Sequence, residues 1–223
     1  MSNSSLSLYW LSTQVLILEA PPPHGLRCQQ MIWRLAEVLR GQAWLREIVP
    51  GMNNLTLELS PDSPPPSRLA ARLQDIWSRC EQETNHSRGR EIDIPVRYGG
   101  RHGPDLDTVA RHCGLSPDQV IERHSAAAYI VYFLGFQPGF AYLGGLDPLL
   151  ATPRRDSPRL RVPAGSVAIG GGQTGVYPAD SPGGWQIIGH TSVSLFDPRN
   201  SGSPSLLLPG DTVRFVPQKG RAC

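Results

Sequence analysis

The chain has 223 residues, of which 39% are hydrophobic and 18% are charged, and its formal net charge is +2. This composition is typical of a folded protein and argues against disorder. The small net charge, with no run of basic residues, excludes the electrostatic pattern of proteins that bind nucleic acids or anionic membranes. The length exceeds the usual size of one domain and favours two.

Lysine and cysteine usage narrows the chemistry further. Lys219 is the only lysine, so a Walker A loop, a pyridoxal phosphate Schiff base and a biotin carrier all lack the residue that they need. Cys28, Cys80, Cys113 and Cys223 have no spacing suited to zinc or to a disulfide framework, and we expect reduced thiols and no metal. With no basic leader and no long apolar run, we expect a cytoplasmic protein.

The first ninety residues predict alternating strands and helices. The predicted strands cover 15–19, 45–49, 55–59 and 92–96, and amphipathic helices with apolar stripes over 31–39 and 69–77 lie between them. Strand, helix, strand, strand, helix, strand is the order of a ferredoxin-like domain. The segment 81–90 is polar and is predicted to be a linker, and the strand that follows it could belong to either neighbouring domain.

The rest of the chain predicts two short helices and then a β domain. The helices cover 105–113 and 117–124, and Ser116 with Gln119 forms a capping box at the start of the second. Short apolar runs separated by glycine and proline turns follow, at 129–134, 166–169, 185–188, 192–196 and 212–216. We therefore predict an α+β fold with a ferredoxin-like domain over 1–90 and a mainly β domain over 91–223.

Two features could bind an anion. The glycine-rich segment 170–175 follows a predicted strand, and its N–H groups could cradle a carboxylate or phosphate, with Gln173 and Thr174 as further donors. A tight turn at a barrel rim is the alternative. The arginines within 154–161 have guanidinium groups that match the same anions, unless they are surface charges paired with Asp156 or Asp180.

Aromatic and histidine residues give further candidates. Phe136, Phe140 and Trp185 lie in turn-rich segments that could wall a pocket, although core packing explains such rings equally well. His124 and His190 are candidates for a general acid or base, and a buried structural histidine is the alternative. No GxSxG nucleophile motif is present.

Several motifs resemble the KipI, or allophanate hydrolase subunit 1, family, and most strongly the B subunits of 5-oxoprolinases within it. They lie at 48–54, 95–100, 103–106, 124–125, 135–140, 152–155, 158–160, 162–167, 172–178, 181–185, 195–198 and 209–217. The likeness covers nearly the whole chain. Ala141 departs from it, because the family usually has proline there. The resemblance implies that the β domain is a cyclophilin-like barrel.

The resemblance also implies an activity. The chain would join the C subunit of the enzyme directly, together with its A subunit, to open the lactam of 5-oxoproline to L-glutamate with ATP as co-substrate. Phosphorylation of the lactam carbonyl oxygen would create a leaving group. Inhibition of a sensor histidine kinase and a role in urea or allophanate processing are the alternatives.

Within this scheme we assign roles to the candidate residues. A carboxylate or phosphoryl oxygen would bind Arg154, Arg155 and Arg159. His124 would move protons. The ligand would be oriented by Gly172, Gln173, Thr174, Gly175 and Tyr177.

Overall fold

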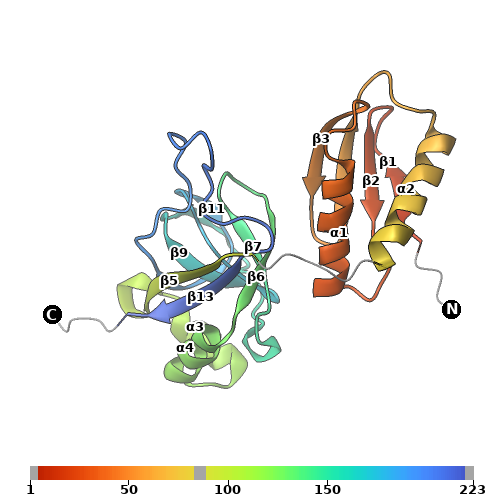
Figure 1. The fold of residues 1–223 in the computed structure, drawn as a ribbon. Coiled ribbons are helices and arrows are strands. Elements are labelled where there is room, and N and C mark those ends of the chain that lie inside the picture. The colour runs from red at the N-terminus through yellow and green to blue at the C-terminus, as the bar shows by residue number, and fades with distance from the viewer. Residues whose placement is uncertain (1–4, 83–88, 219–223) are drawn as a thin grey trace. The chain divides into compact units, whose positions relative to one another are not determined.

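The computed structural model describes residues 5–82 and 89–218, which belong to two compact units, 1–87 and 88–223 (Figure 1). Cys223 therefore lies outside the described residues. Cys28, Cys80 and Cys113 form no disulfide among the described residues, and Cys28 and Cys80 are buried. Within the described ranges, no helix is long and apolar enough to cross a membrane.

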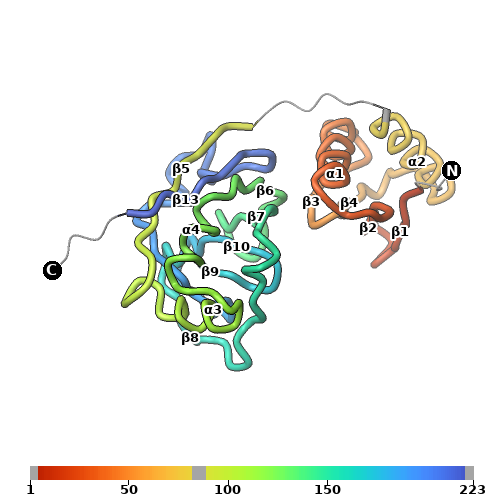
Figure 2. Tube along the Cα trace, turned by 90° about the horizontal axis from the view of Figure 1, so that it is seen from below, coloured from red at the N-terminus to blue at the C-terminus, as the bar shows by residue number. Residues whose placement is uncertain are grey.

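The first unit is a four-stranded antiparallel sheet with two helices on one face (Figures 1 and 2). Its elements are β1 (Ser7–Trp10), β2 (Val15–Glu19), α1 (Leu26–Leu39), β3 (Leu45–Pro50), β4 (Asn54–Leu59) and α2 (Pro66–Gln82), and the strand order is β1-β2-β4-β3. Leu16, Leu18, Leu55 and Leu57 are fully buried. Because strand side chains alternate between faces, these leucines form one apolar layer against the helices.

The predicted strand 92–96 does not complete this sheet. It lies within β5 (Glu91–Tyr98), which belongs to the barrel of the second unit. The sheet edge beside β2 is instead occupied by β1, which the sequence analysis missed. β5 joins the barrel because Ile94 and Val96 are buried in the barrel core and because it pairs in parallel with β13. The first unit keeps the two-layer arrangement of a ferredoxin-like domain with a different edge strand.

The second unit is a closed seven-stranded barrel, in agreement with the predicted α+β class. The barrel is formed by β5, β6 (Tyr129–Leu134), β7 (Ala141–Gly144), β9 (Ser166–Gly170), β10 (Gln173–Val176), β12 (Gln186–His190) and β13 (Thr212–Pro217), in the order β10-β7-β6-β13-β5-β12-β9. The segment 192–196 was wrongly predicted as a strand, since only Phe196 makes a β-bridge.

Four helical segments belong to the barrel unit. They are η1 (Gly100–His102), α3 (Leu106–Cys113), α4 (Pro117–Ala126) and η2 (Pro148–Leu150). The predicted capping box is confirmed at the start of α4: the Gln119 amide donates to Ser116 Oγ at 3.2 Å, and the Ser116 amide donates to Gln119 Oε1 at 2.8 Å. Val109 and Val120 anchor α3 and α4 in the barrel core.

A short ribbon of β8 (Arg159–Val162) and β11 (Ser181–Gly183) encloses a second, smaller apolar cluster. Its buried members are Phe140, Val162, Ala168, Tyr177, Trp185 and Ile187. Along β9, Val167 and Ile169 belong to the barrel core whereas Ala168 belongs to this cluster. Alternation along the strand therefore places the small cluster on the outer face of the barrel.

Candidate functional site

Aromatic rings line the outer face of the barrel. Phe140 contacts both Tyr177 and Trp185 edge to face, with ring centroids 5.6 Å apart in each case, which is the favoured geometry for aromatic pairs. Phe136 lies over this layer, 5.5 Å from Phe140, and is 61% exposed. The buried rings thus serve as core, as the sequence alternative allowed, whereas Phe136 offers an apolar face to solvent.

The backbone of Phe136 is held in an unusual conformation. Its φ is +66°, in the left-handed region that residues other than glycine rarely adopt. The turn is tied down on both sides, because the Gly135 amide donates to the Phe140 carbonyl at 3.1 Å and the Phe140 amide donates to the Gln137 carbonyl at 3.0 Å. Such local strain is typical of segments that present a side chain for binding.

Arg154 borders the aromatic layer. Its guanidinium carbon lies 5.9 Å from the centre of the Trp185 ring, within the range of a cation–π contact. The residue is exposed, and the described structure records no carboxylate paired with it. Arg154 is therefore available to an anionic ligand that lies against the rings.

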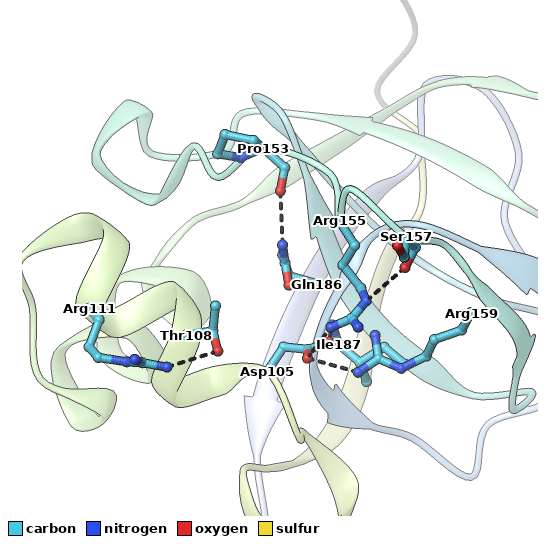
Figure 3. Close-up of polar contacts among 9 residues, drawn as sticks. All are labelled: Asp105, Thr108, Arg111, Pro153, Arg155, Ser157, Arg159, Gln186 and Ile187. Carbon is cyan, nitrogen blue, oxygen red and sulfur yellow. Dashed lines mark hydrogen bonds and ion pairs between the residues drawn. The ribbon is translucent and has the colours of Figure 1, made fainter.

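Arg155 and Arg159 converge on a single buried carboxylate, that of Asp105 (Figure 3). Arg159 Nη2 lies 2.8 Å and Arg155 Nη1 lies 3.3 Å from Asp105 Oδ1, and the Asp105 side chain is 5% exposed. The other carboxylate oxygen accepts a hydrogen bond from the Ile187 amide at 2.7 Å. One negative charge thus orders two guanidinium groups and leaves a surplus positive charge beside Arg154.

Sequence reasoning named Asp156 or Asp180 as possible partners for the arginines within 154–161, and among the described residues this alternative is confirmed for Arg161 alone. Asp180 pairs with Arg161, at 2.6 Å, on the exposed side of the ribbon. The residue that orders Arg155 and Arg159 is Asp105, which the sequence analysis placed within a motif without assigning it a role. Its position 50 residues before Arg155 in the chain gave no local signal, although an aspartate directly after Gly-Pro in a matched motif could have marked it.

Three buried polar atoms near this site have no hydrogen-bond partner among the described residues. They are Arg159 Nη1, Ser181 Oγ and Gln186 Oε1. The orientation of the Gln186 amide is fixed, because its Nε2 donates to the Pro153 carbonyl at 3.0 Å (Figure 3). A buried polar atom without a partner is costly, and a functional role is one explanation for such an atom in a native structure. Gln186 was missed by sequence reasoning, which placed Ser181 within a motif without assigning it a role.

The glycine-rich segment forms a tight hairpin turn. Gly170 pairs with Gln173 across β9 and β10, which leaves Gly171, at φ +62°, and Gly172 as the two turn residues. The Gly171 amide donates to the Thr152 carbonyl at 2.8 Å. Gly171 therefore does not offer its N–H group to an anion, and the geometry supports the turn alternative.

The other residues expected in this segment face different surroundings. Thr174 is fully buried and donates to the Ala168 carbonyl at 3.0 Å, whereas Gln173 is half-buried. Gly175 lies directly beneath the Phe140 ring, which a Cβ atom would approach to 3.2 Å. Tyr177 belongs to the aromatic layer, and burial raises the pKa of its hydroxyl.

His124 lies in the barrel core with no exposed surface. Thr174 already donates to Ala168, so Thr174 Oγ1 accepts from His124 Nε2 at 2.8 Å, and His124 Nδ1 accepts from the Tyr98 hydroxyl at 2.8 Å. The ring stacks on Phe215 at 4.6 Å. Burial lowers the pKa of His124 to about 3, so the ring is neutral at neutral pH.

This placement does not support the hypothesis that His124 moves protons at a substrate. Both ring nitrogens are occupied, and no surface of the ring is open to a ligand. His124 links α4, β5 and β10, which is the buried structural role named as the alternative. His190, the second histidine candidate, lies 3.0 Å from the Ala164 carbonyl through Nε2 and takes no part in the aromatic layer.

The structure thus brings together Arg154, Arg155, Arg159 and Tyr177, and separates them from His124 and Thr174 on the core side. Among the described residues, no group of three or more histidine, cysteine, aspartate or glutamate side chains could hold a metal ion. The assembled site is an apolar, aromatic surface bordered by positive charge. Chemically, it suits a small ligand with an apolar body and an anionic group.

The fold and this site define an α+β protein that combines a helix-covered sheet with a closed barrel carrying an outer aromatic and arginine site. The model of the family "Carboxyltransferase domain, subdomain C and D" matches residues 6–207, and the chain belongs to that family.

Similar proteins agree with this assignment. The B subunit of the 5-oxoprolinase of Escherichia coli O157:H7 is 54% identical over 96% of this chain and 97% of its own, and that of Haemophilus influenzae is 46% identical over 92% and 95%. Among solved structures, the protein TTHA0988 matches with a TM-score of 0.78 and 38% identity. That match covers 93% of this chain but 40% of the longer TTHA0988 chain.

A more distant likeness concerns the fold alone. The urea carboxylase of Kluyveromyces lactis matches with a TM-score of 0.77 at 19% identity, over 22% of its length. This likeness is too remote to favour a role in urea processing.

Proposed function

We propose that this chain is one subunit of an ATP-dependent 5-oxoprolinase, which opens 5-oxoproline to L-glutamate with ATP hydrolysis, together with the A and C subunits of that enzyme. The observation that carries the proposal is the 54% identity, over nearly the full length of both chains, to a relative named as the B subunit of 5-oxoprolinase. Inhibition of a sensor histidine kinase and urea or allophanate processing have no comparable observation in their favour.

The outer barrel site supports the proposal because its chemistry suits the substrate. 5-Oxoproline is a small saturated lactam ring that carries one carboxylate. In our scheme the ring lies against Phe136 and the carboxylate binds Arg154, in the field of the surplus charge of Arg155 and Arg159. Asp105 holds Arg155 and Arg159 in place before the ligand binds. This order reduces the entropy that is lost on binding.

The activation of the lactam requires chemistry beyond this site. ATP, as co-substrate, would transfer its γ-phosphoryl group to the carbonyl oxygen and release ADP. Water would then add to the ring carbon, the C–N bond would break to give an acyl phosphate, and a second water would release phosphate and leave glutamate. Positive charge near the transferred phosphoryl group would stabilise the negative charge on its oxygens in the transition state. Arg159 contributes through its field rather than by direct contact, because Nη2 is fixed on Asp105 and Nη1 is buried.

The described side chains that form the aromatic layer include no carboxylate or imidazole group. Among the described residues around the aromatic layer, Asp105 is paired with arginines, and the pKa of Tyr177 is raised by burial. A general base must come within hydrogen-bond reach of the reacting group. We therefore assign the proton-transfer group to another subunit of the enzyme, and His124 to a positioning role that it exerts on β10 through Thr174.

The test is substrate-stimulated release of ADP by this chain assembled with the purified A and C subunits. We expect 5-oxoproline to stimulate ADP release, and urea and allophanate to leave it at the basal rate. Stimulation by urea or allophanate, with none by 5-oxoproline, would overturn the proposal in favour of the alternative amide substrates.

A further inference from the structure

One face of the sheet in the first unit is not covered by any described element of that unit. The leucines of β2 and β4 at 16, 18, 55 and 57 are buried beneath α1 and α2. Residues between them point to the opposite side of the sheet, because side chains alternate along a strand. Figures 1 and 2 show both helices on the same side of the four strands. We call the opposite side the open face.

A row that is apolar except for Thr56, which we call the apolar row, crosses the open face from edge to edge. Tyr9 pairs with Ile17, Ile17 pairs with Thr56, and Thr56 pairs with Val49, so the row takes one residue from each of the four strands. Directly opposite residues share a face and touch side by side. Tyr9 is 50% and Val49 is 45% exposed, and neither belongs to the apolar core of the unit.

Acidic residues flank this row. On one side, Glu58 lies opposite both Val15 and Glu47, and on the other, Glu19 lies opposite Ser7 and Asn54. Glu58 lies 3.6 Å from the guanidinium of Arg46, which neutralises part of the acidic border. The border therefore keeps an excess of negative charge. An apolar strip with a charged rim is the usual composition of a protein–protein interface.

We propose that the open face docks the C subunit of the enzyme, through an apolar ridge on that partner with a border of arginine or lysine side chains. The inference rests on the proposed function. Two observations favour a different chain over a second copy: two copies would bring acidic borders together, which opposes association, and in TTHA0988 the matched region is 40% of a longer chain, so that relative joins it to further protein.

The test uses one substitution on two faces of the same unit. Val49→Arg puts a positive charge in the apolar row, where it would be buried without a partner against the apolar ridge of the C subunit. Val38→Arg makes the same change on α1, where Val38 is 38% exposed on the helical side. We expect Val49→Arg to weaken the binding of the purified C subunit tenfold or more, measured by calorimetric titration, and Val38→Arg to leave it unchanged.

A second variant tests the charge argument. Glu19→Lys should weaken binding at low salt, and added salt should weaken the wild-type complex and narrow its difference from the variant. Circular dichroism checks that every variant is folded. If wild type, Val49→Arg and Glu19→Lys all bind the C subunit equally, the docking inference is wrong while the proposed function stands.

Two other outcomes are informative. If the wild-type chain binds neither the A nor the C subunit, the proposed function itself fails. If Val49→Arg abolishes self-association while the affinity for the C subunit is unchanged, the open face joins two copies of this chain, which overturns the inference.

Discussion

Single side chains at the outer barrel site have distinct tasks. Asp105 is the organising residue, since one buried carboxylate orders Arg155, Arg159 and the Ile187 amide. Arg154 is free of such a partner in the described structure and stacks over Trp185. We therefore expect Arg154 to contact the ligand directly, and Arg155 and Arg159 to contribute positive charge around it.

Arg154 is expected to contribute to substrate binding more than to stability. Arg154→Ala should raise the KM for 5-oxoproline by about 10- to 100-fold, because a charge-assisted contact to the carboxylate is lost, and should change the free energy of unfolding by less than about 0.5 kcal/mol. Steady-state kinetics of the assembled enzyme measures the first quantity.

The matched control is Arg161→Ala. Arg161 belongs to the same arginine-rich segment, but its side chain is 79% exposed and pairs with Asp180. An unchanged KM in that variant is expected. Equal effects of the two substitutions would mean that the segment acts only through its overall charge.

His124 should make the stability of the barrel sensitive to acid. Its folded-state pKa, about 3, is below the ordinary value of 6.5, so only the unfolded chain binds a proton as the pH falls below that value. The resulting loss is about 2 kcal/mol between pH 7 and pH 5.

Urea unfolding of wild type and of His124→Gln at the two pH values measures this contribution. The variant is expected to be less stable at pH 7 and to lose less stability on acidification. If the unfolding free energies of the two proteins changed equally with pH, the His124 ring would take up a proton in the folded protein as readily as in the unfolded chain. That result would contradict the burial of His124.

At the scale of elements, the β9–β10 hairpin shows why glycine recurs in the segment 170–172. A Cβ atom on Gly170 would lie 2.5 Å from the Trp185 ring, whereas one on Gly172 would meet nothing within 4 Å. Gly170 is therefore required for packing of the aromatic layer, whereas Gly172 lies in open space within the turn.

This difference is testable by alanine substitution. Gly170→Ala should cost about 1–3 kcal/mol of unfolding free energy, because the indole must move, and should change the tryptophan fluorescence of the folded protein. Gly172→Ala should stay within about 0.5 kcal/mol of wild type. Equal stability losses would contradict the contact between Gly170 and Trp185.

Several elements could be predicted because their signals are local. The capping box of Ser116 and Gln119 marks the start of α4, and apolar spacing marks α1 and α2. β5 was harder, since alternation along 92–96 shows that one face is buried but does not identify the neighbouring strand. β1 was missed because it lies at an edge, where most of its residues stay exposed.

The candidate site likewise combines features that are visible in the local sequence with features that depend on the tertiary fold. A cluster of arginines is visible in the sequence, but its partner Asp105 is brought to it only by the tertiary fold. The burial of His124 among Tyr98, Thr174 and Phe215 likewise depends on elements far apart in the chain. Residue type alone does not separate a reactive histidine from a structural one.

At the scale of the whole molecule, the chain has two surfaces with different chemistry. The barrel unit has an aromatic site with surplus positive charge, and the first unit has an open sheet face with an apolar row and an acidic border. Neither surface supplies a complete set of catalytic groups among the described residues. Both features fit a subunit that binds substrate and depends on partner chains for the reaction.

The most direct measurement is glutamate formation from 5-oxoproline and ATP by the A and C subunits of the enzyme, with this chain either added or withheld. We expect glutamate only when the chain is present, at a rate that rises with its concentration until it matches the other two subunits. Equal glutamate formation without the chain, under conditions in which its fold is verified, would contradict its assignment as a subunit of the enzyme.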